Sequence, residues 1–120
     1  MDVESLREYC IQKPATTEGF PFDADTLVFK VMGKMYALVP LEHGQSMNLK
    51  CDPEYAIELR EQYPERIRPG WHMSKTHWNT VSLVDGLPED LLRGLIDHSY
   101  EMVVKGLKKS QREALERGEY

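Results

Sequence analysis

The stretch TLVFKVMGKMYALVP, residues 26–40, decides the fold, because apolar and polar side chains alternate along both of its halves. Alternation of this kind predicts two strands, each with one buried face. Lys30 and Tyr36 fall on the polar side, and Gly33-Lys34 fits a two-residue type II′ hairpin turn with glycine at its first central position. The predicted apolar face of the hairpin carries Leu27, Phe29, Val31, Met35, Ala37 and Val39.

Three further segments continue the strand pattern: residues 46–50, 66–73 and 78–84. In the first, Met47 and Leu49 point inward while Asn48 and Lys50 point outward. In the second, the predicted inner set is Ile67, Trp71 and Met73, and the outer set is Arg66, Arg68 and His72. We therefore expect Trp71 to be buried between sheet and helix. Pro69 lacks a ladder donor, so this segment should be an edge strand or should break there.

Helical patterns surround these strands at residues 2–12, 53–62 and 88–106. Asp52-Pro53 is a helix start, with a capping carboxylate before a proline at the first helical position. Residues 15–25, ATTEGFPFDAD, are predicted to form a loop. The order α-βββ-α-ββ-α, with one apolar face per strand, predicts a two-layer α+β domain. It would hold one antiparallel sheet of about five strands, with helices on one face only.

Length and composition predict one domain over residues 1–120, with a charged C-terminal tail at 108–120. The start, MDVESLREYC, has no signal-peptide pattern, and no apolar run is long enough to span a membrane, so we expect a cytoplasmic protein. The two cysteines stand far apart without a CxxC partner, which favours two reduced thiols.

The formal net charge of −5 is unevenly distributed along the chain. Residues 26–50 and 66–84 carry six Lys or Arg against Glu42 alone, a net charge of +5, so the remainder carries −10. An acidic protein is not a typical nucleic-acid binder. A basic sheet with acidic helices can nevertheless attract an anion to one face.

Metal and catalytic motifs are weak. His72 and His77 are five residues apart across a predicted turn at 74–77, and neither His43 nor His98 has a metal-like spacing to them. The chain has no P-loop, no GxGxxG and no Gly-x-Ser-x-Gly elbow. We therefore predict no metal site, no cofactor and no catalytic residue.

Two interpretations of the polar sheet face remain open. Its cations could contact phosphates, with Tyr36 and Trp78 interleaved as aromatic surfaces. Equally, an exposed face must be polar for solubility, and both tryptophans could be packing residues.

The segments HMSKTHWNTVSL (72–83) and IDHSYEMVVKGL (96–107), together with the first hairpin, resemble the MmcQ/YjbR-like family over residues 1–107. The resemblance implies a CyaY-like (frataxin-like) α+β fold and a DNA-binding role of the double-wing type. The matching positions are His72, Lys75, His77, Trp78, Asn79, Thr80, Ser99 and Tyr100. Ser99 and Tyr100 lie on the apolar stripe of the last long helix, so we interpret them as packing residues.

We therefore predict a small, non-enzymatic binding protein whose partner is duplex DNA, held weakly and in a salt-dependent way, with no membrane contact. The alternative is a module for an acidic protein partner or a small ligand. A third reading is an enzyme that uses His72 or His77. The predicted nucleic-acid contacts are Lys30, Lys50, Arg66, Arg68, His72, Lys75, His77, Trp78 and Asn79.

Overall fold

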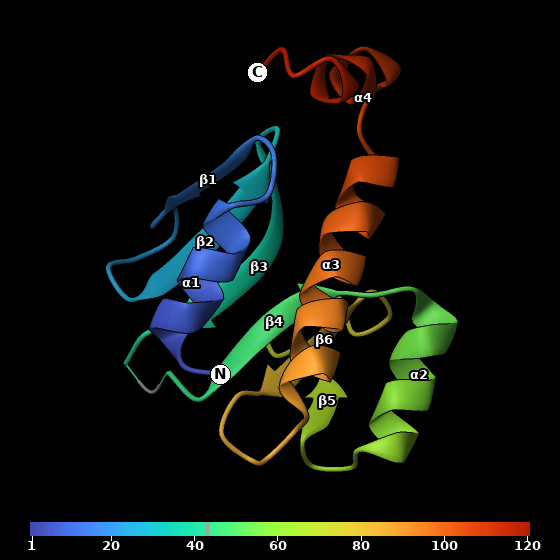
Figure 1. Cartoon of the computed structure of the whole chain (residues 1–120). Coiled ribbons are helices and arrows are strands. Elements are labelled where there is room, and N and C mark those ends of the chain that lie inside the picture. The colour runs from blue at the N-terminus through green and yellow to red at the C-terminus, as the bar shows by residue number, and fades with distance from the viewer. Residues whose placement is uncertain (43) are drawn as a thin grey trace.

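The computed structural model describes residues 1–42 and 44–120, so His43, considered above as a metal ligand, lies outside the described residues. The helices are α1 (Val3–Ile11), α2 (Pro53–Gln62), α3 (Glu89–Lys105) and α4 (Lys109–Glu116). The strands are β1 (Thr16–Gly19), β2 (Thr26–Val31), β3 (Lys34–Pro40), β4 (Ser46–Lys50), β5 (Ile67–Pro69) and β6 (Trp78–Ser82). Figure 1 shows their arrangement.

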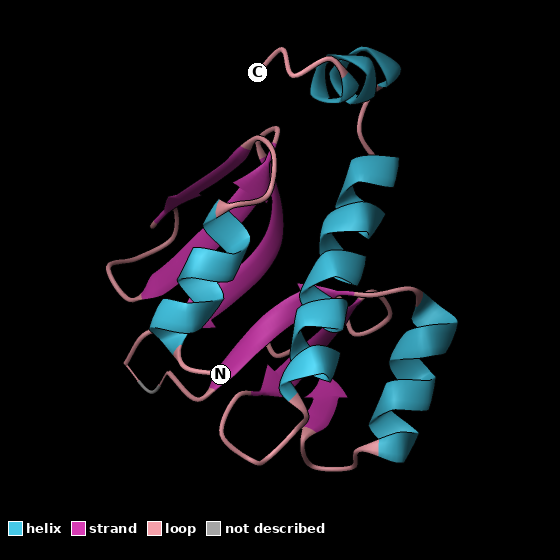
Figure 2. Ribbon diagram, viewed as in Figure 1, coloured by secondary structure: helices cyan, strands magenta, loops and turns pink. Residues whose placement is uncertain are grey.

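Within the described residues the strands form one six-stranded sheet in the order β1-β2-β3-β4-β6-β5, and each neighbouring pair is antiparallel. Helices α1, α2 and α3 lie on the same side of this sheet (Figure 2). The two-layer α+β prediction is confirmed. The loop predicted at 15–25 is wrong in its first part, because Thr16–Gly19 pairs with β2 as an edge strand.

A β-bulge in the second strand of the hairpin changes which side chains face the core, so the prediction for this strand is wrong in part. Phe29 pairs with Ala37 and Lys30 with Met35, which leaves Tyr36 as an extra residue. Tyr36 and Ala37 therefore both lie in the main core, whereas Met35 turns to the opposite face. The turn also differs from the prediction, because its central residues are Met32 (φ 49°) and Gly33 (φ 83°). Two positive φ angles define a type I′ turn.

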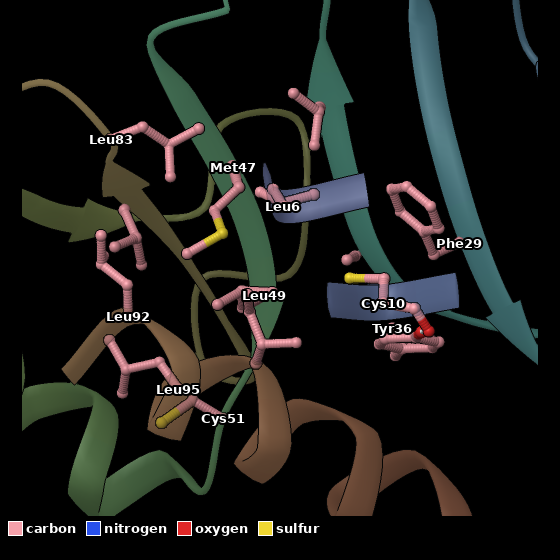
Figure 3. Close-up of a cluster of buried hydrophobic side chains, with 14 of the residues drawn as sticks. Leu6, Cys10, Phe29, Tyr36, Met47, Leu49, Cys51, Leu83, Leu92 and Leu95 are labelled. Carbon is pink, nitrogen blue, oxygen red and sulfur yellow. The ribbon is translucent and has the colours of Figure 1, made fainter. Parts of the chain in front are cut away.

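The main core fills the space between the sheet and its helices (Figure 3). Alternate residues of β2 and β4 supply the sheet side of this core, as predicted. The helices supply Leu6 and Cys10 from α1, Leu59 from α2, and Leu92 and Leu95 from α3. Asp52 caps α2 by accepting a hydrogen bond from the Tyr55 amide at 3.1 Å, which confirms the predicted helix start.

The join between β3 and β4 depends on a side chain of α3. These strands pair only at Ala37–Leu49 and Leu38–Asn48. One position further on, the Ser99 hydroxyl accepts a hydrogen bond from the Lys50 amide at 2.8 Å and donates one to the Tyr36 carbonyl at 2.5 Å. Ser99 is fully buried. Its hydroxyl thus replaces a missing ladder bond and ties α3 to both strands, so the packing role predicted for Ser99 is confirmed.

The C-terminal segment is more ordered than a charged tail. Helix α4 follows a break at Gly106, and its Leu115 packs against the main core. No helix in the described part of the chain combines the length and apolarity that crossing a membrane requires.

Candidate nucleic-acid interface

An open cleft lies on the side of the sheet away from the helices, over β4, β5 and β6. We call it the outer cleft, and its volume is about 710 Å³. Its basic side chains are Arg66, Arg68 and Lys75, and its hydroxyl side chains are Ser46, Thr80 and Ser82. The remaining lining residues are Gln45, Glu65, Pro69, Trp71, Val84 and Asp85.

The two arginines reach the cleft because successive side chains around Ile67 point to opposite faces of the sheet. Ile67 pairs with Val81 and is buried in the main core, so its neighbours Arg66 and Arg68 point to the opposite side. Arg68 pairs with Thr80 across the ladder. The Arg66 guanidinium lies 5.7 Å from the centre of the Tyr63 ring. Among the described residues, no carboxylate lies within salt-bridge distance of either arginine.

Two carboxylates moderate the charge of the outer cleft. Residues 66–84 contain no acid, but Glu65 and Asp85 flank that segment and both line the cleft. Asp85 accepts a hydrogen bond from the Ser82 hydroxyl at 2.8 Å. With three cations against two carboxylates, the field at this cleft is positive but modest.

The predicted basic face is not continuous. Lys30 pairs with Thr17 and lines a separate hollow of about 280 Å³ near β1. Lys50 pairs with Trp78 and is half-buried outside the cleft. An outer apolar cluster interrupts the polar surface instead. It consists of buried Val28, Leu38 and Trp78, from β2, β3 and β6, with Met35 and Met73 packed against them.

Trp78 and Asn79, both predicted to contact nucleic acid, are buried. Trp78 is 9 % exposed and packs in the outer apolar cluster, so its ring offers no open stacking surface. Asn79 is 2 % exposed on the helix side, where it accepts a hydrogen bond from Arg60 Nε at 2.7 Å and donates to the Ala56 carbonyl. These positions remove both residues from the predicted contact set.

Arg60 is a structural residue that the sequence did not indicate. Beyond its bond to Asn79, its Nη2 donates to the backbone carbonyls of Lys75 and Trp78. Arg60 therefore ties helix α2 to the turn that joins β5 and β6. Lys75 Nζ donates to the Gly70 carbonyl at 3.3 Å across the same turn, while the side chain of His77 is exposed.

The prediction that Trp71 is buried is wrong, because its side chain is 70 % exposed. Strand β5 ends at Pro69, and the Gly70 amide then donates to the Trp78 carbonyl at 2.8 Å. A Cβ on Gly70 would lie 2.8 Å from the Trp78 Cβ, so the chain passes there without room for a side chain. The alternation that predicted burial stops at this point. Trp71 turns to the outer cleft and stacks on His72, with ring centres 4.8 Å apart.

Neither cysteine is an activated nucleophile. Burial raises the pKa of the Cys10 thiol to about 12 and that of the Cys51 thiol to about 11. Both thiols are free, and a protonated thiol is a poor nucleophile. Across residues 1–42 and 44–120, no three His, Cys, Asp or Glu side chains gather as a metal site would require.

A second polar group lies at the junction of α1 and α3. Tyr9 donates to Asp97 Oδ1 at 2.8 Å, and Lys13 Nζ lies 2.5 Å from the same oxygen. Tyr100 donates to the Pro14 carbonyl at 2.6 Å and packs edge-on against Tyr36. These contacts pair every charged member of the group, so they fix α1 on α3. They also confirm the packing role predicted for Tyr100.

Known proteins share this arrangement over most of the chain. A family model described as YjbR matches residues 11–102. The Escherichia coli K12 protein named uncharacterized protein YjbR is 34 % identical over 116 residues, which cover 96 % of this chain and 98 % of the relative. Uncharacterized protein YbdF of E. coli O157:H7 is 36 % identical over 123 residues, covering 98 % of this chain and all of the relative.

Solved structures agree with the sequence relatives. The crystal structure of Deinococcus radiodurans protein DR2400 superposes with a TM-score of 0.89 at 42 % identity, covering 95 % of this chain and 87 % of that one. A crystal structure from Pseudomonas syringae gives a TM-score of 0.72 at 30 % identity, covering 85 % and 98 %. Sequence and fold therefore lead to the same conclusion: this chain belongs to the YjbR family.

Proposed function

We propose that the protein binds DNA, and that the outer cleft is the contact surface. The observation that carries this proposal is the pair Arg66 and Arg68, which flank Ile67 at the start of β5 and have no carboxylate within salt-bridge distance among the described residues. Two guanidinium groups that line one open cleft suit phosphates, because arginine binds a phosphate through two parallel hydrogen bonds. Lys75 adds a third cation at the rim.

The contacts should be mainly to phosphates, because no helix of the described chain is placed to enter a groove from this side of the sheet (Figure 1). Affinity should then depend weakly on sequence and steeply on salt. The modest local charge and the net charge of −5 predict weak binding, with a dissociation constant in the micromolar range or above at physiological salt.

The test is a fluorescence-anisotropy titration of labelled DNA, as duplex and as single strand, over a range of salt concentrations. The triple variant Arg66→Ala, Arg68→Ala, Lys75→Ala should bind more weakly. It should also flatten the dependence of log K on log salt by about one unit for each lost phosphate contact, so by up to about three units.

The matched control removes three exposed cations elsewhere: Lys34→Ala, Lys105→Ala and Arg112→Ala. It changes the net charge equally but leaves the cleft intact. Equal loss in both triple variants would mean that general charge attracts the DNA, which overturns the assignment to the cleft. Absence of binding to any DNA at low salt overturns the proposal itself. The cations of the cleft would then serve the alternative role of docking an acidic protein.

A further inference from the structure

The exposure of Trp71 is unusual for the largest apolar side chain. Trp71 is 70 % exposed although one neighbour, His72, stacks on its ring at an interplanar angle of 25°. An exposed tryptophan contributes little to folding stability, since an apolar side chain contributes roughly 1.5–3 kcal/mol only when it is fully buried. An exposed tryptophan inside a polar cleft therefore points to a ligand that covers it.

The backbone beneath Trp71 is fixed on both sides. The Trp71 amide donates to Thr80 Oγ1 at 3.0 Å, and Thr80 Oγ1 donates to Asn48 Oδ1 at 2.6 Å on β4. The preceding residue, Gly70, is bonded to β6. Hydrogen bonds to β6 thus fix the backbone of Trp71 before any ligand binds, which reduces the entropy lost on binding.

The same cleft combines this ring with the cations described above. Trp71, Arg66 and Arg68 all line it, so an aromatic surface lies beside guanidinium groups. Its volume of about 710 Å³ falls in the range of roughly 300–1,000 Å³ of ligand pockets. A ligand that suits both features has a flat aromatic part joined to an anion, and a nucleotide unit has this composition.

The geometry points to single-stranded nucleic acid as the preferred ligand, with one unpaired base stacked on Trp71 and the adjoining phosphates on Arg66 and Arg68. This inference rests on the proposed function and narrows its ligand. In a duplex each base face is already covered by its neighbours, so an aromatic platform gains contact only after unstacking. An unpaired base offers its face without that cost.

The experiment compares three labelled 12-mers by anisotropy: oligothymidine, an abasic oligomer of the same charge, and a duplex. Wild type should bind oligothymidine about 5- to 150-fold more tightly than the abasic strand, the range that corresponds to roughly 1–3 kcal/mol for one stacked base. Trp71→Ala should abolish this margin and leave the salt dependence unchanged. Trp71→Phe should keep part of the margin, because a smaller ring still stacks.

Phe22→Ala is the matched control. Phe22 is an aromatic residue of similar exposure, 61 %, in the loop beside β1 at the opposite edge of the sheet. The Phe22→Ala variant should bind all three oligomers as tightly as wild type does. Equal binding of oligothymidine and abasic strand by wild type overturns the stacking inference but leaves phosphate binding intact. No binding of any oligomer refutes the proposed function as well.

Discussion

Ser99→Ala tests whether one hydroxyl group holds the sheet together. The substitution removes the oxygen that accepts from the Lys50 amide and donates to the Tyr36 carbonyl, and it leaves the rest of α3 unchanged. Ser99 and Tyr36 are fully buried and Lys50 is half-buried, so the two backbone groups have little access to water in the folded protein. Both groups lose their partner at the position where β3 and β4 no longer pair.

The expected cost follows from these contacts. A buried polar group left without a partner costs about 1–3 kcal/mol, and two such groups are affected. Alanine in place of serine in a helix returns up to about 0.5 kcal/mol through its higher helix propensity. The net loss in the free energy of unfolding should therefore be about 1.5–6 kcal/mol.

The assay is urea denaturation followed by far-ultraviolet circular dichroism, with Ser110→Ala as control. Ser110 is exposed in α4, so this variant makes the same change in a helix without touching the sheet. It should be neutral or slightly stabilising. A loss below about 1 kcal/mol in Ser99→Ala, with an unchanged m-value, would show that the strands close up and pair directly, which refutes the bridging role.

Two further predictions concern packing and pH. Gly70→Ala places a methyl group 2.8 Å from the Trp78 Cβ, so it should cost about 1–3 kcal/mol in the same assay; a neutral effect would show that the turn shifts freely. Burial raises the pKa values of Cys10 and Cys51 to about 12 and about 11, so above about pH 9 the thiols ionise in the unfolded chain first. The free energy of unfolding should then fall by about 1.4 kcal/mol per pH unit for each thiol. In the double variant Cys10→Ala, Cys51→Ala the free energy of unfolding should fall less steeply with pH. Equal slopes for wild type and double variant would contradict thiol ionisation as the cause.

Much of the fold could be predicted because its strands and helices carry strong periodic patterns. The alternation in residues 26–31 and 46–50 and the Asp52-Pro53 helix start all correspond to the structure. The facing of β3 could not be predicted, because one bulged residue inverts every side chain on one side of it. β1 is four residues long and half-exposed, so it lacks the apolar alternation that marks a strand.

The candidate site was harder to predict than the fold. Alternation predicted the outward direction of Arg66 and Arg68 but was carried past Pro69-Gly70, a turn signal that could have indicated the break before Trp71. The burial of Asn79 could not be foreseen, since it depends on Arg60, a residue 19 positions earlier on helix α2. Likewise, only the folded chain brings both Glu65 and Asp85 into the cleft that holds the two arginines.

The unequal exposure of the two tryptophans gives the protein two internal fluorophores in different surroundings. Trp78, at 9 % exposure, should emit at shorter wavelength and report global unfolding, whereas Trp71, at 70 %, should emit near the wavelength of indole in water. Added iodide should quench Trp71 and spare Trp78. Emission spectra of the unlabelled protein can therefore separate events in the outer cleft from loss of the folded state within a single sample.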